Sequence, residues 1–270
     1  TLILAVKARL RGVRVVWWGH YWSSTSRKWR MVLRIMLMRL AHGVVFYTDH
    51  EVDEYRAGTG AHDTRPIVGL NNGINTSSIQ VLRAPYAAQE RGPEILFIGR
   101  QTAKARLPLL IKALASPQLA NARLHVVGEG IESASSYAAA ETLGVINRIH
   151  WHGASTDEAV IAPIANRCRI FVYPGEVGLS LIHGMAYGLP CVVHSDRWRH
   201  MPEFAGFEEG LTGRSYVHGD TDDLAQVVCS LLNEEETLNR MSHQCIAVTT
   251  RSYNTEDMAK RLLEMVKRLK

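Results

Sequence analysis

The chain has 270 residues and 46% apolar content, which suits one large domain or two modest ones with an ample core. It contains no uncharged apolar run of about eighteen residues, so no membrane-spanning helix is expected. The net charge of +5 favours anionic ligands, and nucleotide phosphates, nucleic acid and acidic lipid surfaces all qualify.

The first part of the chain is predicted to form a partial α/β domain. It begins with Thr1 and enters at once on a helix-like stretch, so we expect an N-terminally truncated chain. Helices are predicted at 2–11, 27–41 and 51–57, and strands at 13–18, 44–48 and 66–70. A complete domain of this kind commonly needs roughly 100–150 residues. Residues 1–86 therefore predict an incomplete one.

The predicted helix at 27–41 carries two stripes of different character. The apolar stripe predicts a core face and consists of Trp29, Leu33, Met36 and Leu40. The basic stripe suggests peripheral contact with an acidic membrane surface and consists of Arg27, Arg30 and Arg34.

The second part of the chain, residues 87–254, is predicted to be a doubly wound α/β domain. A polar, proline-containing stretch at 84–93 precedes it and is interpreted as a linker. Strands are predicted at 94–98, 123–127, 148–152, 170–173 and 191–194, with helices between them. Such alternation favours a parallel sheet. Residues 255–270 predict a final amphipathic helix.

The stretch 169–194 organises this second domain. A buried strand is stopped by Pro174 and Gly175, and a helix begins after Gly178. Free amides at a helix N-terminus favour an anion, typically phosphate. Glu176 in this loop can accept hydrogen bonds from sugar hydroxyls or brace the helix. His183 can contact a ribose or phosphate, although a histidine bonded between helix and sheet explains it equally simply.

Cations follow the strand at 94–98. Gly99 and Arg100 come directly after it, and Lys104 and Arg106 follow closely. Because they lie at the carboxyl end of a parallel strand, they can clamp a diphosphate at the same edge as the 175–178 loop. A solvated basic loop is the alternative.

Three further residues are candidates on weaker local grounds. Gly128 ends the neighbouring strand and lets the backbone approach a ligand, or simply makes a turn. The carboxylate of Glu203 can bind hydroxyls near the same crevice, or belong to a solvated loop. His20 ends a strand in the first domain and can contact a substrate across an interdomain cleft, or make only a local contact.

Histidines and cysteines give little sign of a metal centre. His150 and His152 share one face of a strand, but no third ligand stands at useful spacing. The cysteines are widely spaced without a CxxC pair, which favours reduced thiols in a cytoplasmic protein. They are Cys168, Cys191, Cys229 and Cys245.

In the order and spacing of its motifs, nearly the whole chain resembles family 4 glycosyltransferases. Asn71-Asn72-Gly73-Ile74 matches the segment that ends that family's N-terminal domain. The other motifs are FIGR at 97–100, VVGEG at 126–130, HWHG at 150–153, YPGEVGLSLIHGMAYGLPCVV at 173–193, MPEF at 201–204 and GLTG at 210–213.

The resemblance implies the GT-B architecture, in which two Rossmann-like domains face a cleft, here with the N-terminal, acceptor-side domain incomplete. The C-terminal domain of such enzymes holds a nucleotide-sugar donor. Arg100 and Lys104 would contact its phosphates, and the backbone of Gly178, Leu179 and Ser180 would meet the diphosphate. The terminal helix at 255–270 would cross back to the N-terminal domain.

The chain departs from the family pattern in its acidic pair. The usual E-x7-E glutamates fall on Gly175 and His183, with Glu176 displaced by one position, and the usual lysine falls on Ala105. We expect a retaining, metal-independent glycosyltransferase that moves a sugar to a glycan or lipid-linked acceptor, using His20 and Glu176 and no cofactor. We expect it in the cytoplasm, with peripheral contact to the inner membrane face.

Two other functions stay open. One is an inactive nucleotide-binding fragment of such an enzyme, and the other is a sugar-nucleotide epimerase of the same architecture. The epimerase would need a set of acid/base carboxylates, and no clear set is present. Nucleic-acid binding is disfavoured because the basic residues are dispersed and not interleaved with aromatic ones.

Overall fold

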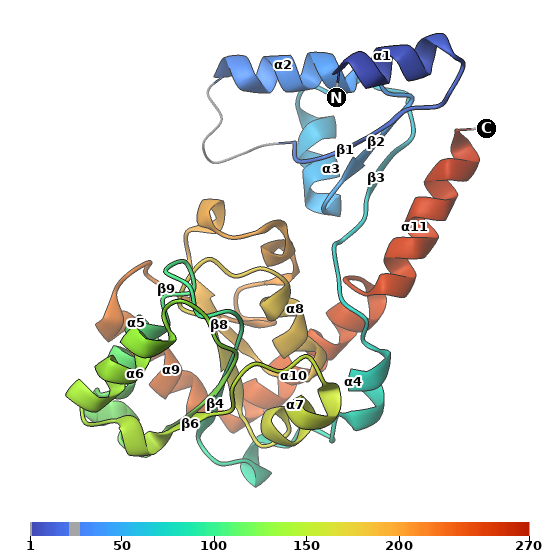
Figure 1. Ribbon diagram of the computed structural model, residues 1–270. Coiled ribbons are helices and arrows are strands. Elements are labelled where there is room, and N and C mark those ends of the chain that lie inside the picture. The colour runs from blue at the N-terminus through green and yellow to red at the C-terminus, as the bar shows by residue number, and fades with distance from the viewer. Residues whose placement is uncertain (1, 22–27, 270) are drawn as a thin grey trace. The chain divides into compact units, whose positions relative to one another are not determined.

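The computed structural model describes residues 2–21 and 28–269, and only the backbone of Leu2 and Lys28. The chain divides into two compact units (Figure 1). Unit 1 comprises Thr1–Gly73 and Ser252–Lys270, and unit 2 comprises Ile74–Arg251. The division lies earlier than the predicted boundary after residue 86, because helix α4 (Ser77–Leu82) packs against α7 (Glu158–Ala165) of unit 2.

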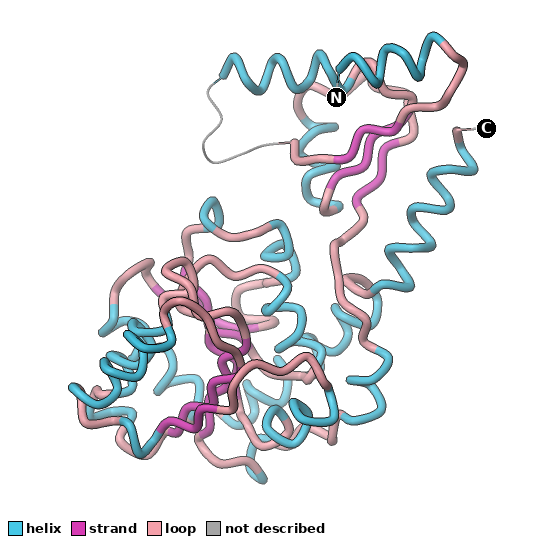
Figure 2. The backbone as a smooth tube through the Cα atoms, in the orientation of Figure 1, coloured by secondary structure: helices cyan, strands magenta, loops and turns pink. Residues whose placement is uncertain are grey.

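Unit 2 contains a parallel sheet with the strand order β6-β5-β4-β7-β8-β9 (Figure 2). The chain builds outward from β4 to β6 and then returns to place β7 on the other side of β4, which confirms the predicted doubly wound α/β arrangement. The strands are β4 (Glu94–Ile98), β5 (Arg123–Val127), β6 (Ile149–Trp151), β7 (Ile170–Val172), β8 (Cys191–His194) and β9 (Gly213–Tyr216).

Helices cover both faces of this sheet (Figure 1). One face carries α5 (Leu107–Leu114), α6 (Ser133–Thr142) and α9 (Thr221–Leu232), and the other carries α7, α8 (Leu179–Ala186) and α10 (Glu235–Arg251). Short 3₁₀ turns complete the unit: η1 (Ala88–Glu90), η2 (Pro117–Leu119), η3 (Ile146–Arg148), η4 (Arg197–Arg199) and η5 (Pro202–Gly206). Because both faces are covered, the central strands are buried throughout, and apart from Glu94 at the start of β4 their residues are apolar.

Two elements of unit 2 were not predicted. β9 reads GRSY, with Arg214 and Ser215 half-buried, so no apolar run marks it. It pairs with β8 at close range, since a Cβ on Gly213 would lie 1.9 Å from the carbonyl oxygen of Cys191. Helix α4 is short and buries only Ile79, which leaves no periodic pattern to detect.

Unit 1 contains a second parallel sheet of order β1-β2-β3. Its strands are β1 (Val16–Trp18), β2 (Gly43–Phe46) and β3 (Ile67–Gly69), and its helices are α1 (Leu2–Leu10), α2 (Lys28–Met38), α3 (Asp49–Ala57) and α11 (Thr255–Arg268). Alternate residues of β2 face opposite layers. Val44 and Phe46 pack with Met38 of α2 and Tyr55 of α3.

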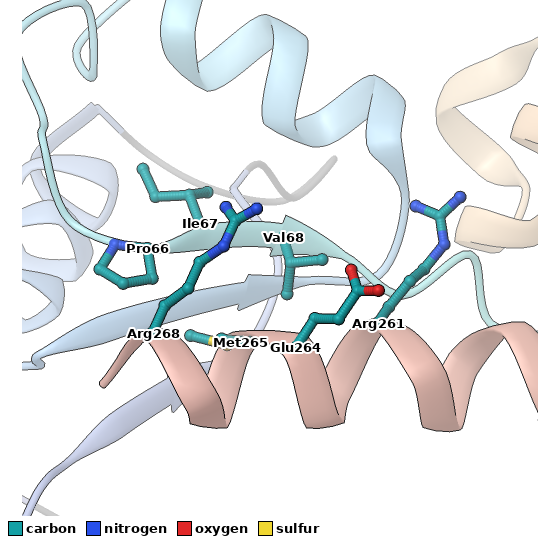
Figure 3. Close-up of a pocket in the computed structure, with 7 residues that line it drawn as sticks. All are labelled: Pro66, Ile67, Val68, Arg261, Glu264, Met265 and Arg268. Carbon is teal, nitrogen blue, oxygen red and sulfur yellow. The ribbon is translucent and has the colours of Figure 1, made fainter. Parts of the chain in front are cut away.

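The C-terminal helix α11 forms the other layer of the unit 1 sheet. Val45 packs against Met265, and Figure 3 shows α11 running along β3 with Met265 beside Val68. Arg261 on the same helix donates to the carbonyl oxygen of Gly69. A Cβ on Gly43 would lie 2.4 Å from Met265 Cε, so the small residue there allows the close approach.

The predicted core stripe of α2 is wrong. Trp29, Leu33 and Met36 are 58%, 48% and 60% exposed, whereas Ile35 and Met38 are buried. In the predicted basic stripe, Arg34 donates to the carbonyl oxygens of His20 and Tyr21. Arg27 lies outside the described residues. Among the described residues, no helix combines the length and the apolar character needed to cross a membrane.

Candidate functional site

The candidate site lies in unit 2, at the carboxyl ends of β4 and β7. These neighbouring strands flank the point where the strand order reverses, which is where open α/β sheets bind ligands. A Cβ on Gly99, just after β4, would lie 3.0 Å from the ring of Tyr173 and 3.1 Å from Ser180 Oγ. The loops after β4 and β7 and the start of α8 therefore meet at one place.

The two loops are joined by their backbones. The Glu176 amide donates to the carbonyl oxygen of Lys104 at 2.9 Å. A Cβ on Gly175 would lie only 1.8 Å from that same oxygen, so no side chain fits at residue 175. The nearest place for a carboxylate is therefore residue 176, where Glu176 Oε2 lies 2.7 Å from Lys104 Nζ.

The Lys104–Glu176 ion pair holds the two side chains at the site but adds little to the stability of the fold. Lys104 is 69% exposed, and ion pairs of this kind contribute about 1 kcal/mol or less. An incoming anion can therefore recruit the ammonium group without disrupting the fold. Arg100, which follows Gly99, is exposed at the same edge of the sheet.

The N-terminus of α8 offers uncapped backbone amides. Gly178 is the N-cap residue and supplies no capping side chain to the first turn, which begins with Leu179 and Ser180. These amides carry the partial positive charge of the helix end. A Cβ on Gly178 would lie 3.4 Å from Glu203 Oε2, so this buried carboxylate also lies at the start of α8.

His200 links the loop after β7 to the end of β8, and the sequence alone indicated no role for it. Its Nδ1 accepts the Val177 amide at 3.1 Å, which fixes the proton on Nε2, and Nε2 donates to the carbonyl oxygen of His194 at 2.8 Å. Burial lowers the pKa of His200 to about 4, so the ring stays neutral near pH 7. Only the folded positions of the loops after β7 and β8 reveal this contact.

A basic hollow of about 230 Å³ opens beside Glu176. It is lined by Ala103, Lys104, Arg106, Glu176, Arg199 and His218. Arg106 Nη1 lies 3.0 Å from His218 Nε2. Arg199 is paired with Asp196 at 3.0 Å.

Three other predicted residues have partners within the protein. His183 Nε2 lies 3.0 Å from Glu158 Oε1 on α7, so the ring is bonded between two helices, and a ligand would have to share it. A Cβ on Gly128 would lie 2.1 Å from the carbonyl oxygen of Gly99, so protein backbone fills the space next to this glycine. His20 belongs to unit 1, where it lies 3.2 Å from buried Glu51 and stacks on Tyr47.

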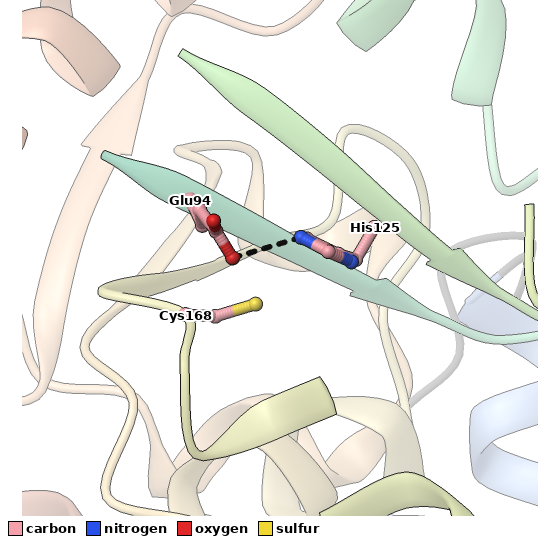
Figure 4. A group of neighbouring side chains, drawn as sticks. All are labelled: Glu94, His125 and Cys168. Atoms are coloured by element: carbon pink, nitrogen blue, oxygen red, sulfur yellow. Dashed lines mark hydrogen bonds and ion pairs between the residues drawn. The ribbon is translucent and has the colours of Figure 1, made fainter. Parts of the chain in front are cut away.

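The residues that could hold a metal lie at the opposite edge of the sheet. Glu94, His125 and Cys168 gather near the amino ends of β4 and β7 (Figure 4). The His125 ring already bonds Glu94 at 2.9 Å and His152 at 3.0 Å, and Arg167 Nε lies 2.8 Å from the same Glu94 oxygen. Hydrogen bonds thus account for this cluster, and burial raises the pKa of the Cys168 thiol, which disfavours a thiolate ligand.

The His200 bridge predicts a measurable dependence of stability on pH. Replacing His200 with Leu leaves the Val177 amide and the His194 carbonyl unpaired, which should lower the free energy of unfolding by about 2–4 kcal/mol. Since the folded pKa of about 4 lies below the unfolded value, wild-type stability falls as the pH drops from about 6.5 to 4.

The variant should show a shallower slope over this range in urea unfolding at several pH values. Some slope remains, because burial also lowers the pKa of His194 to about 3 and that of His125 to about 4. An unchanged slope would contradict the bridge.

The chain is similar in sequence to known proteins. A sequence relative is the lipopolysaccharide 1,6-galactosyltransferase of Salmonella typhimurium, 26% identical over 155 residues, which cover 55% of this chain and 42% of that protein. Another is the N-acetyl-alpha-D-glucosaminyl L-malate synthase of Bacillus anthracis, 24% identical over 164 residues, which cover 60% and 42%. The matches thus span less than half the length of these relatives.

A solved structure shares the fold. The crystal structure of Anabaena HepE in complex with UDP matches with a TM-score of 0.72 at 16% identity, and the match covers 98% of this chain and 75% of that one. The neighbours of this kind have the GT-B fold. The sequence profile described as "Glycosyl transferases group 1" matches residues 78–247, well over half of the chain. The chain therefore belongs to the group 1 glycosyl transferases.

Proposed function

We propose that the protein is a retaining glycosyltransferase that moves a sugar from a uridine diphosphate sugar donor to a glycan or lipid-linked acceptor. The observation that carries this proposal is the meeting of Lys104, Glu176 and the uncapped start of α8 at the reversal point of a parallel sheet. Family membership supports the reaction class, and the UDP bound to Anabaena HepE supports the nucleotide. The motif order also supports membership of family 4.

The donor diphosphate would bind to the amides of Leu179 and Ser180, with Gly99 and Gly178 allowing close approach. Arg100 and Lys104 would neutralise its charge. In the reaction, the bond from the anomeric carbon to the diphosphate breaks, the acceptor hydroxyl oxygen forms the new bond to that carbon, and the hydroxyl proton passes to the departing diphosphate. Stabilising the departing charge is the principal task, and we propose that these cations and amides perform it without a metal ion.

The remaining predicted residues have supporting roles in this proposal. Glu176 would accept hydrogen bonds from the sugar hydroxyls, in place of the glutamate that cannot fit at residue 175. Glu203 would hold the start of α8 in position, and Gly128 would line the donor side. His183 would reach the donor while sharing Glu158. His20, held by Glu51, would act on the acceptor side.

Arg100 provides the direct test of the proposed function. Arg100→Ala should lower kcat/KM for donor turnover by about 10²–10³, corresponding to the loss of one transition-state donor, or about 2.7–4 kcal/mol. Turnover of UDP-sugars by the full chain and by the variant would be followed by UDP release, with and without a chelator.

Arg123→Ala serves as the matched control, because Arg123 is an exposed arginine at the amino end of β5, the opposite edge of the sheet. An unchanged Arg100→Ala rate would remove the assignment. Tight UDP binding without any turnover would favour the inactive nucleotide-binding alternative.

We also propose that the protein works in the cytoplasm, in peripheral contact with the inner membrane face, where lipid-linked acceptors would be found. The supporting feature is α2, on which Trp29, Leu33 and Met36 are exposed next to Arg30. Exposed aromatic and apolar side chains beside cations bind acidic lipid interfaces.

Vesicle co-sedimentation tests this contact. Binding to phosphatidylglycerol vesicles should exceed binding to phosphatidylcholine vesicles and should fall several-fold in a Trp29→Ser, Met36→Ser variant. Val81→Ser is the control, because Val81 is 84% exposed but lies on α4 of unit 2. Binding that is indifferent to anionic lipid would remove the membrane proposal.

A further inference from the structure

Arg106 stands out among the residues of the basic hollow. Its backbone has φ 54° and ψ 33°, the left-handed conformation, at the N-cap of α5. Residues other than glycine adopt this conformation at a cost of about 1–3 kcal/mol, and such strain tends to persist at functional sites. Because glycine would adopt this backbone conformation without strain, we infer that the side chain of Arg106 has a function.

The charge of Arg106 is not balanced by a carboxylate. Its guanidinium contacts His218 Nε2 at 3.0 Å, and within the described ranges 2–21 and 28–269 it forms no ion pair. Lys104 is paired with Glu176, and Arg199 with Asp196. Burial and the nearby Arg106 charge lower the pKa of His218, which favours the neutral ring that accepts from Arg106 and carries no charge to balance it. The hollow therefore presents an unpaired, fork-shaped cation that fits an oxyanion.

The hollow adjoins the proposed diphosphate site, because Lys104 and Glu176 both line it. None of its lining residues belongs to the start of α8 or to Gly99 and Arg100. Its other walls come from the α5 N-terminus, η4 and the segment after β9. A group in this hollow would lie next to both Lys104, a proposed diphosphate contact, and Glu176, the proposed acceptor of the sugar hydroxyls, which is where the proposed donor carries its sugar.

We propose that the basic hollow is a subsite for an acidic donor sugar, such as a hexuronic acid, whose carboxylate binds Arg106. Glu176 on the rim accepts hydrogen bonds from the sugar hydroxyls, while Arg106 distinguishes acidic from neutral sugars. This inference deepens the proposed function and rests on the sugar side of that same site.

Sugar 1-phosphates test the subsite without the nucleotide. The full chain should bind glucuronic acid 1-phosphate at least about tenfold more tightly than glucose 1-phosphate in an NMR or calorimetric titration, as expected for a hydrogen bond to a charged group. Arg106→Gly should reduce this preference to near one. Its Tm should stay level or rise, because glycine adopts the left-handed conformation without strain.

Two further variants sharpen the comparison. Arg106→Lys keeps the charge but loses the fork, and it should retain only part of the preference. Lys112→Ala removes an exposed cation from the same helix and should leave the preference unchanged. A strong fall in Tm for Arg106→Gly would mean that Arg106 acts through its contact with His218, and this would overturn the proposal.

Other outcomes also decide the matter. Equal binding of the two sugar phosphates, binding of neither, or a preference that survives Arg106→Gly overturns the subsite. So does a loss of UDP affinity in Arg106→Gly as large as the loss for the acidic sugar, since Arg106 would then serve the diphosphate. If the acidic preference is present while UDP fails to bind, the subsite stands and the uridine donor falls.

Discussion

The carbonyl oxygen of Lys104 occupies the space of a side chain at residue 175, and the organisation of the site depends on this contact. Through this contact the loop after β4 packs against the loop after β7. The Glu176 amide donates a hydrogen bond to the same oxygen and links the two loops. Because no side chain fits at residue 175, the carboxylate of this loop comes from Glu176, which pairs with Lys104. A glutamate side chain at residue 175 would clash with the Lys104 carbonyl oxygen.

Much of the fold could be predicted, because buried parallel strands leave a clear signal. β4 and β8 are buried throughout and largely apolar, and they were found with their bounds, since both faces of the sheet are covered. β9 escaped because an edge strand with half-exposed polar residues has no such pattern. On α2 the wrong face was predicted as the core face, because Ile35 and Met38 pack inward while Trp29 stays exposed, and tertiary packing selects the face.

The candidate site was predictable where its chemistry is local. Gly99, Lys104 and Glu176 follow strands that end at one edge, so their meeting follows from topology. The contacts from distant elements were not predictable: His200 reaches Val177 from beyond β8, and Glu158 reaches His183 from α7. The left-handed backbone of Arg106 gives no sign in the sequence, because arginine is not a residue that marks that conformation.

A crystal structure of the full chain with UDP would examine the donor site most directly. We expect diphosphate oxygens within about 3 Å of the Leu179 and Ser180 amide nitrogens, with Arg100 or Lys104 in contact with the same group. UDP bound at another part of unit 2, with the start of α8 unliganded, would contradict the proposed donor site.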